Sequence, residues 1–327
     1  MHLIPVVPKT VGIFMNKCNI CPRGCNINRQ ENIGYCKSDN SIRAARAALH
    51  FWEEPCISGT SGSGAVFFSG CNMRCIFCQN FDIAANNKGI KLTNTELSDI
   101  FLRLQESGAN NINLVTPTHF TYEIIKALEL AKSKGLVIPI VYNTSSYENV
   151  NTLKDLCGLV DVYLPDFKYV DNNIAKEYSS APDYFEVASR ALEEMYRQVG
   201  KARFFTKEET DKFNADNNLK IDYELMKSGI IVRHLCLPGT SNDSIAVIKY
   251  LYETYKDNIY ISIMNQYTPL PQVKDHKLLH RKLTSYEYNK VVNYAIDLGV
   301  INGFTQDGRV AKESFIPDFD FTGILKK

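Results

Sequence analysis

Short apolar runs alternate with stretches of helical periodicity along most of this chain. Apolar runs bounded by turn-forming residues are typical of buried strands. They predict strands at Ala65–Ser69, Asn111–Val115, Val137–Tyr142, Val160–Pro165, Ile230–Leu237 and Tyr260–Met264. Between the runs, apolar residues at helical spacing predict helices at Asn94–Ser107, Tyr122–Ser133, Glu148–Cys157, Asn173–Val199 and Asp243–Tyr255. Strands connected by such helices pair in parallel through right-handed crossovers.

This alternation predicts an α/β fold, and its six strand–helix units fit an open, partial (β/α)6 barrel. We expect the barrel to span residues 59–270, after an N-terminal cysteine-rich metal-binding extension over residues 1–58. Residues 271–327 should form a C-terminal helical cap, with one helix over Ser285–Leu298. In barrels of this kind, functional side chains gather at the carboxyl ends of the strands.

Two segments outside the alternation have patterns of their own. Ile42–His50 is rich in alanine and arginine and predicts a short helix, because both residue types favour helices. Lys201–Leu219 is rich in charge and asparagine and only weakly periodic, so we expect an exposed hairpin or excursion there.

Composition and charge narrow the class of protein. The 327 residues are 45% hydrophobic and 22% charged, the balance of an ordinary soluble globular protein. A net charge of +1 gives no electrostatic basis for binding a nucleic acid or an anionic membrane. The sequence has no apolar run of about 18 residues, as a membrane span requires, and its start lacks the features of a signal peptide. We therefore expect a cytoplasmic protein whose ten cysteines are reduced thiols or metal ligands.

The first candidate site is a cysteine loop directly after the first predicted strand. Cys71, Cys75 and Cys78 have the spacing C-x3-C-x2-C, which allows three thiolates to bind one iron–sulfur cluster. A [4Fe–4S] cluster has four irons, so one iron is left for another ligand. A zinc site is the alternative, but it requires a fourth ligand, and the next 40 residues contain neither Cys nor His.

A second group of cysteines precedes the barrel. Cys18, Cys21, Cys25 and Cys36 are separated by turn-forming residues, so they lie on a loop and not on a helix face. Four such thiols fit a tetrahedral zinc site, and they fit a second [4Fe–4S] cluster equally well in number. The x2, x3, x10 spacing matches neither common ferredoxin pattern, which favours zinc or another structural metal. Cys56 belongs to neither group, and such single cysteines are most often small buried hydrophobes.

The loop with Cys71, Cys75 and Cys78 resembles the signature of the radical S-adenosylmethionine (SAM) enzymes, including the aromatic Phe77 before the last cysteine. The resemblance implies a barrel of the radical SAM type, in which the amino and carboxylate groups of SAM chelate the open iron. Reduction of the cluster then cleaves SAM to methionine and a 5′-deoxyadenosyl radical, which abstracts a hydrogen atom.

Polar side chains stand at the carboxyl ends of the later predicted strands, where they suit the amino, carboxylate and ribose groups of SAM. A carboxylate such as Asp166 suits the amino group, a cation such as Lys168 the carboxylate, and an amide such as Asn143 the ribose hydroxyls. The candidate SAM-binding residues are Phe77, Thr116, Asn143, Asp166, Lys168, Arg233, His234 and Gln266.

Further motifs resemble uncharacterised relatives of pyruvate formate-lyase activating enzyme. They include Cys-Asn-Ile-Cys-Pro-Arg-Gly-Cys near the start, Glu-Glu-Pro-Cys-Ile-Ser-Gly, and Val-Arg-His-Leu-Cys-Leu-Pro-Gly at the fifth strand. In glycyl-radical activases an Asp-x-Lys motif contacts SAM, and Asp166 and Lys168 match it. Two motifs depart from that pattern. Thr116-Pro117-Thr118 replaces Gly-Gly-Glu, and Asn265-Gln266-Tyr267 replaces a late histidine motif.

We therefore expect a radical SAM oxidoreductase, similar to the activating enzymes, that abstracts hydrogen from a peptide or protein substrate. Activation of a glycyl-radical enzyme is one such case, and a flavodoxin or ferredoxin-type protein would act as reductant. The alternatives are radical modification of a small molecule and a non-catalytic scaffold that binds zinc or an iron–sulfur cluster. We expect neither a membrane nor a nucleic acid as partner.

Overall fold

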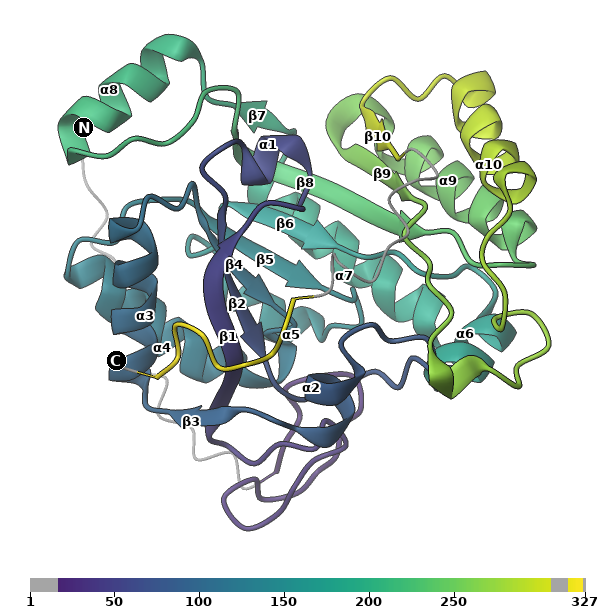
Figure 1. The fold of residues 1–327 in the computed structure, drawn as a ribbon, viewed down its shortest axis with the longest axis horizontal. Coiled ribbons are helices and arrows are strands. Elements are labelled where there is room, and N and C mark those ends of the chain that lie inside the picture. Colours follow the sequence, from purple (N-terminus) through teal and green to yellow (C-terminus); the bar gives the residue numbers. More distant parts are fainter. Residues whose placement is uncertain (1–16, 307–316, 326–327) are drawn as a thin grey trace.

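Residues 17–306 and 317–325 are described by the computed structural model of the protein, so the start of the chain, assessed above for a signal peptide, lies outside the described residues. One curved sheet runs through the molecule (Figure 1). Its strands are β1 (Ile42–His50), β2 (Ser63–Phe68), β3 (Ile90–Leu92), β4 (Ile112–Val115), β5 (Ile140–Thr144), β6 (Val162–Pro165), β7 (Arg203–Phe204), β8 (Met226–Leu235), β9 (Tyr260–Met264) and β10 (Gly303–Thr305).

The strand order is β10-β9-β8-β6-β5-β4-β2-β1-β3, with the short β7 paired to β8. The neighbours from β2 to β10 are all parallel, and they include the six predicted strands. β1 and β3 add antiparallel strands at the other edge. The sheet is open, so the predicted partial barrel is confirmed.

Helices cover the outer face of this sheet. The long ones are α3 (Asn94–Glu106), α4 (Thr121–Ser133), α7 (Tyr184–Val199), α9 (Ser241–Tyr255) and α10 (Ser285–Leu298), and the shorter ones are α5 (Val150–Lys154), α6 (Asn172–Ser179) and the peripheral α8 (Lys207–Asn217). Two short helices, α1 (Pro55–Ser58) and α2 (Phe81–Asn86), pack instead against side chains of the inner face. Short 3-10 turns lie at Thr118–Phe120, Lys256–Asn258 and Pro271–Val273. The largest apolar core lies between the long helices and the outward side chains of the strands, such as Val66, Leu114 and Val232.

The prediction of a helix over Ile42–His50 was wrong, because these residues form β1. The strand pairs with β2 on one side and β3 on the other. Its alanines Ala44, Ala45 and Ala47 are buried in this position. Small side chains with high helix propensity are therefore held in a strand by tertiary pairing, which outweighs a weak local preference.

Two predictions about helices also need correction. The stretch from Asn173 to Val199 is two helices, α6 and α7, since Ser180 ends the first in a left-handed conformation with φ 52°. The expected excursion after Lys201 contains a regular helix, α8. Thr206 and Glu209 form a capping box at its N-terminus, and such a box satisfies backbone N–H groups that are otherwise unpaired.

The glycine–serine run before β2 is fixed by one distant carboxylate. Asp222 accepts hydrogen bonds from the backbone N–H groups of Thr60 (2.6 Å) and Ser61 (2.8 Å) and from the side chain of Asn110 (2.8 Å). A Cβ on Gly59 would lie 2.3 Å from an oxygen of Asp222, and Gly59 also has a φ of +53°. Both facts require glycine at this turn.

The structure also bears on the predicted segments. β1 belongs to the expected N-terminal extension and β10 to the expected cap, yet both strands pair within the main sheet. The boundaries at residues 58 and 270 stay predictions. Across residues 17–306 and 317–325, no helix is both long and apolar enough to cross a membrane.

We predict that Asp222→Asn lowers the free energy of unfolding by about 1.5–3 kcal/mol at pH 7, the range for hydrogen bonds to a charged group. Burial opposes ionisation of Asp222, but the hydrogen bonds from Asn110, Ser61 and Thr60 lower its pKa. Its contribution is therefore complete above the unfolded pKa of about 3.9 and is lost as the pH falls through the lower folded value.

Urea unfolding at several pH values measures this effect. The deficit of Asp222→Asn should be full at pH 7 and should shrink below about pH 4. Asp216→Asn, on the exposed face of α8, is the matched control and should unfold like the parent. A deficit that is independent of pH would contradict the prediction.

Candidate functional site

The cysteine loop begins where β2 ends. Gly70 has a φ of +88°, and a Cβ there would lie 2.6 Å from the carbonyl oxygen of Cys36. Glycine is therefore required at the turn that directs the chain from β2 into Cys71. The chain then continues past the carboxyl end of β2 through Cys71, Cys75 and Cys78, and α2 begins after this loop, at Phe81.

The three thiols of this loop lie close enough to interact electrostatically. Burial raises the pKa of Cys71 to about 12, and the neighbouring charge of Cys75 adds to the rise. Burial, then the charges of Cys75 and Cys71, also raises the pKa of Cys78. These buried groups are therefore neutral thiols on their own, and a metal would bind them as thiolates with release of their protons. Three cysteines on one loop are a donor set that fits an iron–sulfur cluster.

Hydrogen-bond donors already face two of these sulfurs. The backbone N–H of Met73 donates to the sulfur of Cys71 at 3.4 Å, and the hydroxyl of Ser179 donates to the sulfur of Cys75 at 3.0 Å. Hydrogen bonds to cysteine sulfur are among the factors that set the reduction potential of iron–sulfur clusters. Ser179, at the end of α6, was not predicted, because 104 residues separate it from Cys75.

The N-terminal cysteines form a second group beside the first. Burial raises the pKa of Cys21 to about 12, and the charges of Cys36 and Cys18 contribute. Burial is also the main cause of the raised pKa of Cys36, to which Cys18 and Cys25 add. Within residues 17–306 and 317–325, no three histidine, cysteine or carboxylate side chains surround a single point as ligands of one metal ion.

The two cysteine loops are in direct contact (Figure 1, where the N-terminal loop is purple). The backbone N–H of Cys71 donates to the carbonyl oxygen of Cys36 at 3.2 Å. Arg23 donates to the carbonyl oxygen of Asn72 at 2.7 Å, and its guanidinium group lies 4.2 Å from the centre of the Tyr35 ring. Arg74 lies 4.5 Å from the same ring and donates to the carbonyl oxygen of Tyr35. The N-terminal loop is therefore part of the site.

Arg233, on β8, is the centre of the polar side chains at the strand ends. Its Nε donates to Asp166 at 2.9 Å, its Nη1 to Glu53 at 2.9 Å and its Nη2 to Asn143 at 2.6 Å. Lys168 donates to the other oxygen of Asp166 at 2.7 Å. The structure thus brings together four of the eight predicted SAM-binding residues.

The charges in this group stabilise one another. Burial opposes ionisation of Asp166, but the positive charges of Arg233 and Lys168 outweigh it and lower its pKa. Burial likewise opposes protonation of Lys168, yet Asp166 and then Cys75 raise its pKa. The influence of Cys75 shows that the ammonium group of Lys168 lies near the cysteine loop, so the two parts of the site adjoin.

Glu53 and Glu54 belong to this group but were not predicted as site residues. They precede α1 in the connection from β1, and the side chain of Asn113 donates to Glu53 at 2.9 Å. Glu54 is 8% exposed, and burial raises its pKa against the opposing charge of Arg233. One of its buried oxygens has no hydrogen-bond partner among the described residues. The Glu-Glu-Pro motif was the only sign of these residues in the sequence. It is 180 residues away from Arg233 along the chain, so the sequence did not indicate their contact.

Another buried carboxylate was missed near the end of β5. Glu148 accepts hydrogen bonds from the hydroxyls of Thr118 (2.6 Å) and Thr144. Burial raises the pKa of Glu148 to about 7. Thr118 belongs to the segment that stands where the activases have Gly-Gly-Glu. In this protein its hydroxyl donates to the buried carboxylate of Glu148.

The remaining predicted residues lie in three places. The ring of Phe77 packs at 6.5 Å from that of Tyr267, and Gln79 donates to the carbonyl oxygen of Gln266 at 3.0 Å. Phe77 and Gln266 therefore lie together at the cysteine loop. The backbone N–H of Thr116 donates to the carbonyl oxygen of Asn143 at 2.9 Å, which places Thr116 at the end of β4.

His234 does not join the other predicted residues. Side chains alternate along a strand, so the neighbour of Arg233 faces the helical layer. There its Nδ1 lies 2.8 Å from the carbonyl oxygen of Phe167. Burial lowers the pKa of His234 to about 4, and the imidazole is therefore neutral.

Comparisons with known proteins bear on the family of this chain. Residues 65–206 match the family model described as the radical SAM superfamily, which confirms the predicted superfamily. An uncharacterised protein of Methanocaldococcus jannaschii, MJ0674, is 29% identical over 292 residues, covering 86% of this chain and 75% of that protein.

Two solved structures are also similar. SuiB of Streptococcus suis, determined bound to SAM, is 13% identical with a TM-score of 0.46, and the match covers 72% of this chain. The match spans about half of SuiB (48%). A domain of pyruvate formate-lyase activating enzyme from Bacteroides vulgatus is 12% identical with a TM-score of 0.36, and the match covers 57% of this chain and 91% of that domain.

We predict that Arg233→Lys lowers the free energy of unfolding by about 1.5–3 kcal/mol, because lysine keeps the charge but its single nitrogen cannot reach the three acceptors that the three guanidinium nitrogens reach. Urea unfolding measures the change. Arg190→Lys, on the exposed face of α7, is the matched control and should have no effect. Equal stability of Arg233→Lys and the parent would contradict the role given to the guanidinium group.

Proposed function

We propose that this protein, whose residues 65–206 match the family model of the radical SAM superfamily, is a radical SAM enzyme acting on a peptide or protein substrate. Superfamily membership implies a [4Fe–4S] cluster and SAM, and we assign the cluster to Cys71, Cys75 and Cys78. One observation carries the assignment. The three thiols of a single loop interact electrostatically at the same sheet edge as Asp166 and Lys168.

When bound, the cluster supplies the electron that cleaves SAM to methionine and a 5′-deoxyadenosyl radical. Among the described residues Lys168 donates to one acceptor, Asp166, so its ammonium group keeps further N–H donors for the SAM carboxylate. Arg233 is different, because each of its nitrogens already donates to a protein acceptor. Its role is to hold Asp166 and Asn143 in the orientation that receives the amino and ribose groups.

Phe77, Thr116 and Gln266 complete the proposed SAM site. Phe77 and Gln266 lie at the cysteine loop, where the backbone and ring of Phe77 suit contact with the adenine. Thr116 lies at the end of β4, beside the carbonyl oxygen of Asn143. We leave His234 out of the SAM site, because its ring faces the helical layer.

The substrate class follows from the family motifs. Asp166 and Lys168 match the Asp-x-Lys of glycyl-radical activases, and Arg233 to Gly239 match their Arg-x-x-x-x-Pro-Gly. These matches support a peptide or protein substrate, with activation of a glycyl-radical enzyme as one case. A flavodoxin or ferredoxin-type protein would be the reductant, in the cytoplasm.

The second proposal concerns a structural or electron-carrying metal on Cys18, Cys21, Cys25 and Cys36. Its support is the electrostatic influence of these thiols on one another and the backbone hydrogen bond from the N–H of Cys71 to the carbonyl oxygen of Cys36. Four thiolates leave no open position, so this metal would not cleave SAM. A loop with little core of its own would also need a metal to hold its shape.

We predict that replacing Cys71, Cys75 and Cys78 together by alanine abolishes reductant-dependent formation of 5′-deoxyadenosine. The assay uses anaerobically reconstituted protein, SAM and dithionite, with product measured by chromatography. Cys157→Ala removes an exposed cysteine outside both groups and should retain the parent rate. Undiminished product from the triple variant would refute the cluster assignment.

We also predict that metal analysis of the anaerobically purified protein finds more metal ions per chain than one [4Fe–4S] cluster contains. Zinc with about four irons per chain indicates a structural zinc site, and about eight irons without zinc indicates a second cluster. Alanine at Cys18, Cys21, Cys25 and Cys36 should remove only the additional metal. About four irons in both proteins, with no zinc, would refute the second site.

A further inference from the structure

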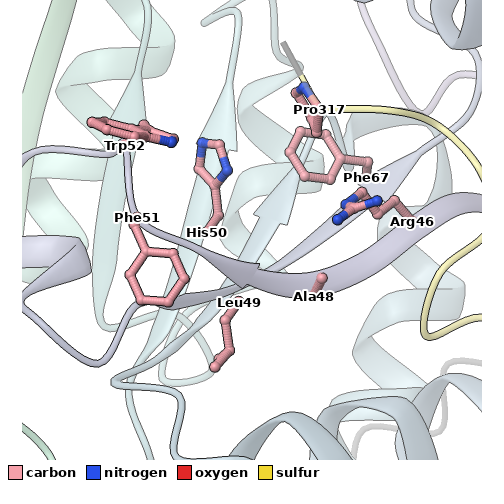
Figure 2. Close-up of a pocket in the computed structure, with 8 residues that line it drawn as sticks. All are labelled: Arg46, Ala48, Leu49, His50, Phe51, Trp52, Phe67 and Pro317. Carbon is pink, nitrogen blue, oxygen red and sulfur yellow. The ribbon is translucent and has the colours of Figure 1, made fainter. Parts of the chain in front are cut away.

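A separate pocket of about 180 Å³ lies on the inner face of β1 and β2 (Figure 2). Arg46, Ala48 and His50 of β1 line it on the same face as Phe67 of β2, because Arg46 and Phe67 are paired in register. Leu49, Phe51, Trp52 and Pro317 complete the lining. The sequence did not predict this pocket, because residues 42–50 were expected to form a helix and not the strand β1 that lines it.

The pocket adjoins the polar site but is distinct from it. The charge of Arg233 contributes to lowering the pKa of His50, so the pocket and the Arg233 group are close enough to interact electrostatically. None of the predicted SAM-binding residues lines the pocket. A ligand placed here would therefore lie beside the proposed SAM site without competing for its polar groups.

His50 is a neutral hydrogen-bonding group in this pocket. Burial, then the charges of Arg46 and Arg233, lowers its pKa to about 4. Its ring lies edge-on to Phe67, with the ring centres 6.0 Å apart. No hydrogen bond from another described residue reaches its two ring nitrogens. Arg46 also lines the pocket, and its positive charge would attract an anion beside His50.

Arg46 has a free edge for such an anion. Its Nη1 donates to Asp320 and to the carbonyl oxygen of Asp318, both at 2.9 Å. Its Nε and Nη2 have no acceptor among the described residues, and these two groups form the fork that binds a carboxylate with two hydrogen bonds. Figure 2 shows the guanidinium group directed toward the His50 side of the pocket. The pair with Asp320, which is 55% exposed, holds the side chain only weakly.

We propose that this pocket binds a carboxylate of the substrate, with the adjoining apolar or aromatic group packed between Phe67, His50 and Pro317. Arg46 receives the carboxylate through Nε and Nη2, and the neutral His50 donates or accepts one further hydrogen bond. The pocket volume suits one side chain of a peptide. The inference rests on the proposed function only in calling the ligand a substrate, since the binding itself needs neither the cluster nor SAM.

Trp52 makes the test direct, because it is the single tryptophan of the sequence and lines the pocket. The anaerobically purified full-length protein is titrated with N-acetyl-L-phenylalanine, and separately with the neutral N-acetyl-L-phenylalaninamide. We expect a saturable change in tryptophan fluorescence with the acid and at least about tenfold weaker binding of the amide, the ratio that one lost charged interaction of about 1.4 kcal/mol produces.

Variants then identify the groups responsible. Arg46→Gln should weaken binding of the acid at least about tenfold, and Arg46→Lys, which keeps the charge but not the fork, should lie between it and the parent. Arg190→Gln is the matched control and should bind like the parent. Thermal unfolding of each variant shows whether the fold is retained, and His50→Ala provides a second weakening substitution if Arg46→Gln is unstable.

Equal affinity for acid and amide would overturn the proposal, as would parent-like binding by folded Arg46→Gln, or no saturable change with the acid. The triple alanine variant at Cys71, Cys75 and Cys78 separates this result from the proposed function. Binding of the acid should persist in that variant although SAM cleavage is lost. Failure of cleavage in the parent with binding intact would refute the enzyme and leave the carboxylate pocket standing.

Discussion

The buried guanidinium group of Arg233 is the interaction on which the interior of the open barrel depends. A buried charge is stable only where hydrogen-bonded partners replace water. Here those partners come from three other parts of the chain: Glu53 before α1, Asn143 on β5 and Asp166 after β6. The same bonds that satisfy the charge also fix the positions of the side chains proposed to meet SAM. Stability and the proposed binding of SAM therefore depend on the same residue.

The group contains one carboxylate more than it has cations. Glu53, Glu54 and Asp166 face Arg233 and Lys168, and burial raises the pKa of Glu54. Glu54 is therefore the carboxylate that most readily takes a proton when no further cation is present. On the other side of Lys168, the cysteine loop is joined to the N-terminal loop by the backbone hydrogen bond from Cys71 to Cys36. The two loops and the polar group therefore adjoin one another.

The sequence predicted those features that depend on local pattern. Apolar runs predicted the six parallel strands, and the carboxyl ends of those strands correctly placed Asn143, Asp166, Lys168 and Arg233 together. β1 could not be predicted in this way, because alanine and arginine favour a helix until β2 and β3 offer partners on both sides. Glu53 was missed for a related reason. It meets Arg233 across 180 residues, and nothing in the local sequence indicates that contact.

The segment of residues 317–325 that lies along β1 has a consequence for biosynthesis. The backbone N–H of Ala47 donates to the carbonyl oxygen of Thr322 at 2.9 Å, and Arg46 bonds to Asp318 across 272 residues. Chains fold as they are made, at about 5–20 residues per second. β1 and β2 therefore leave the ribosome well before the segment that packs against them. Until that segment follows, Phe67 lacks its neighbour Phe319, and the inner face of β1 stays open to water and to chaperones.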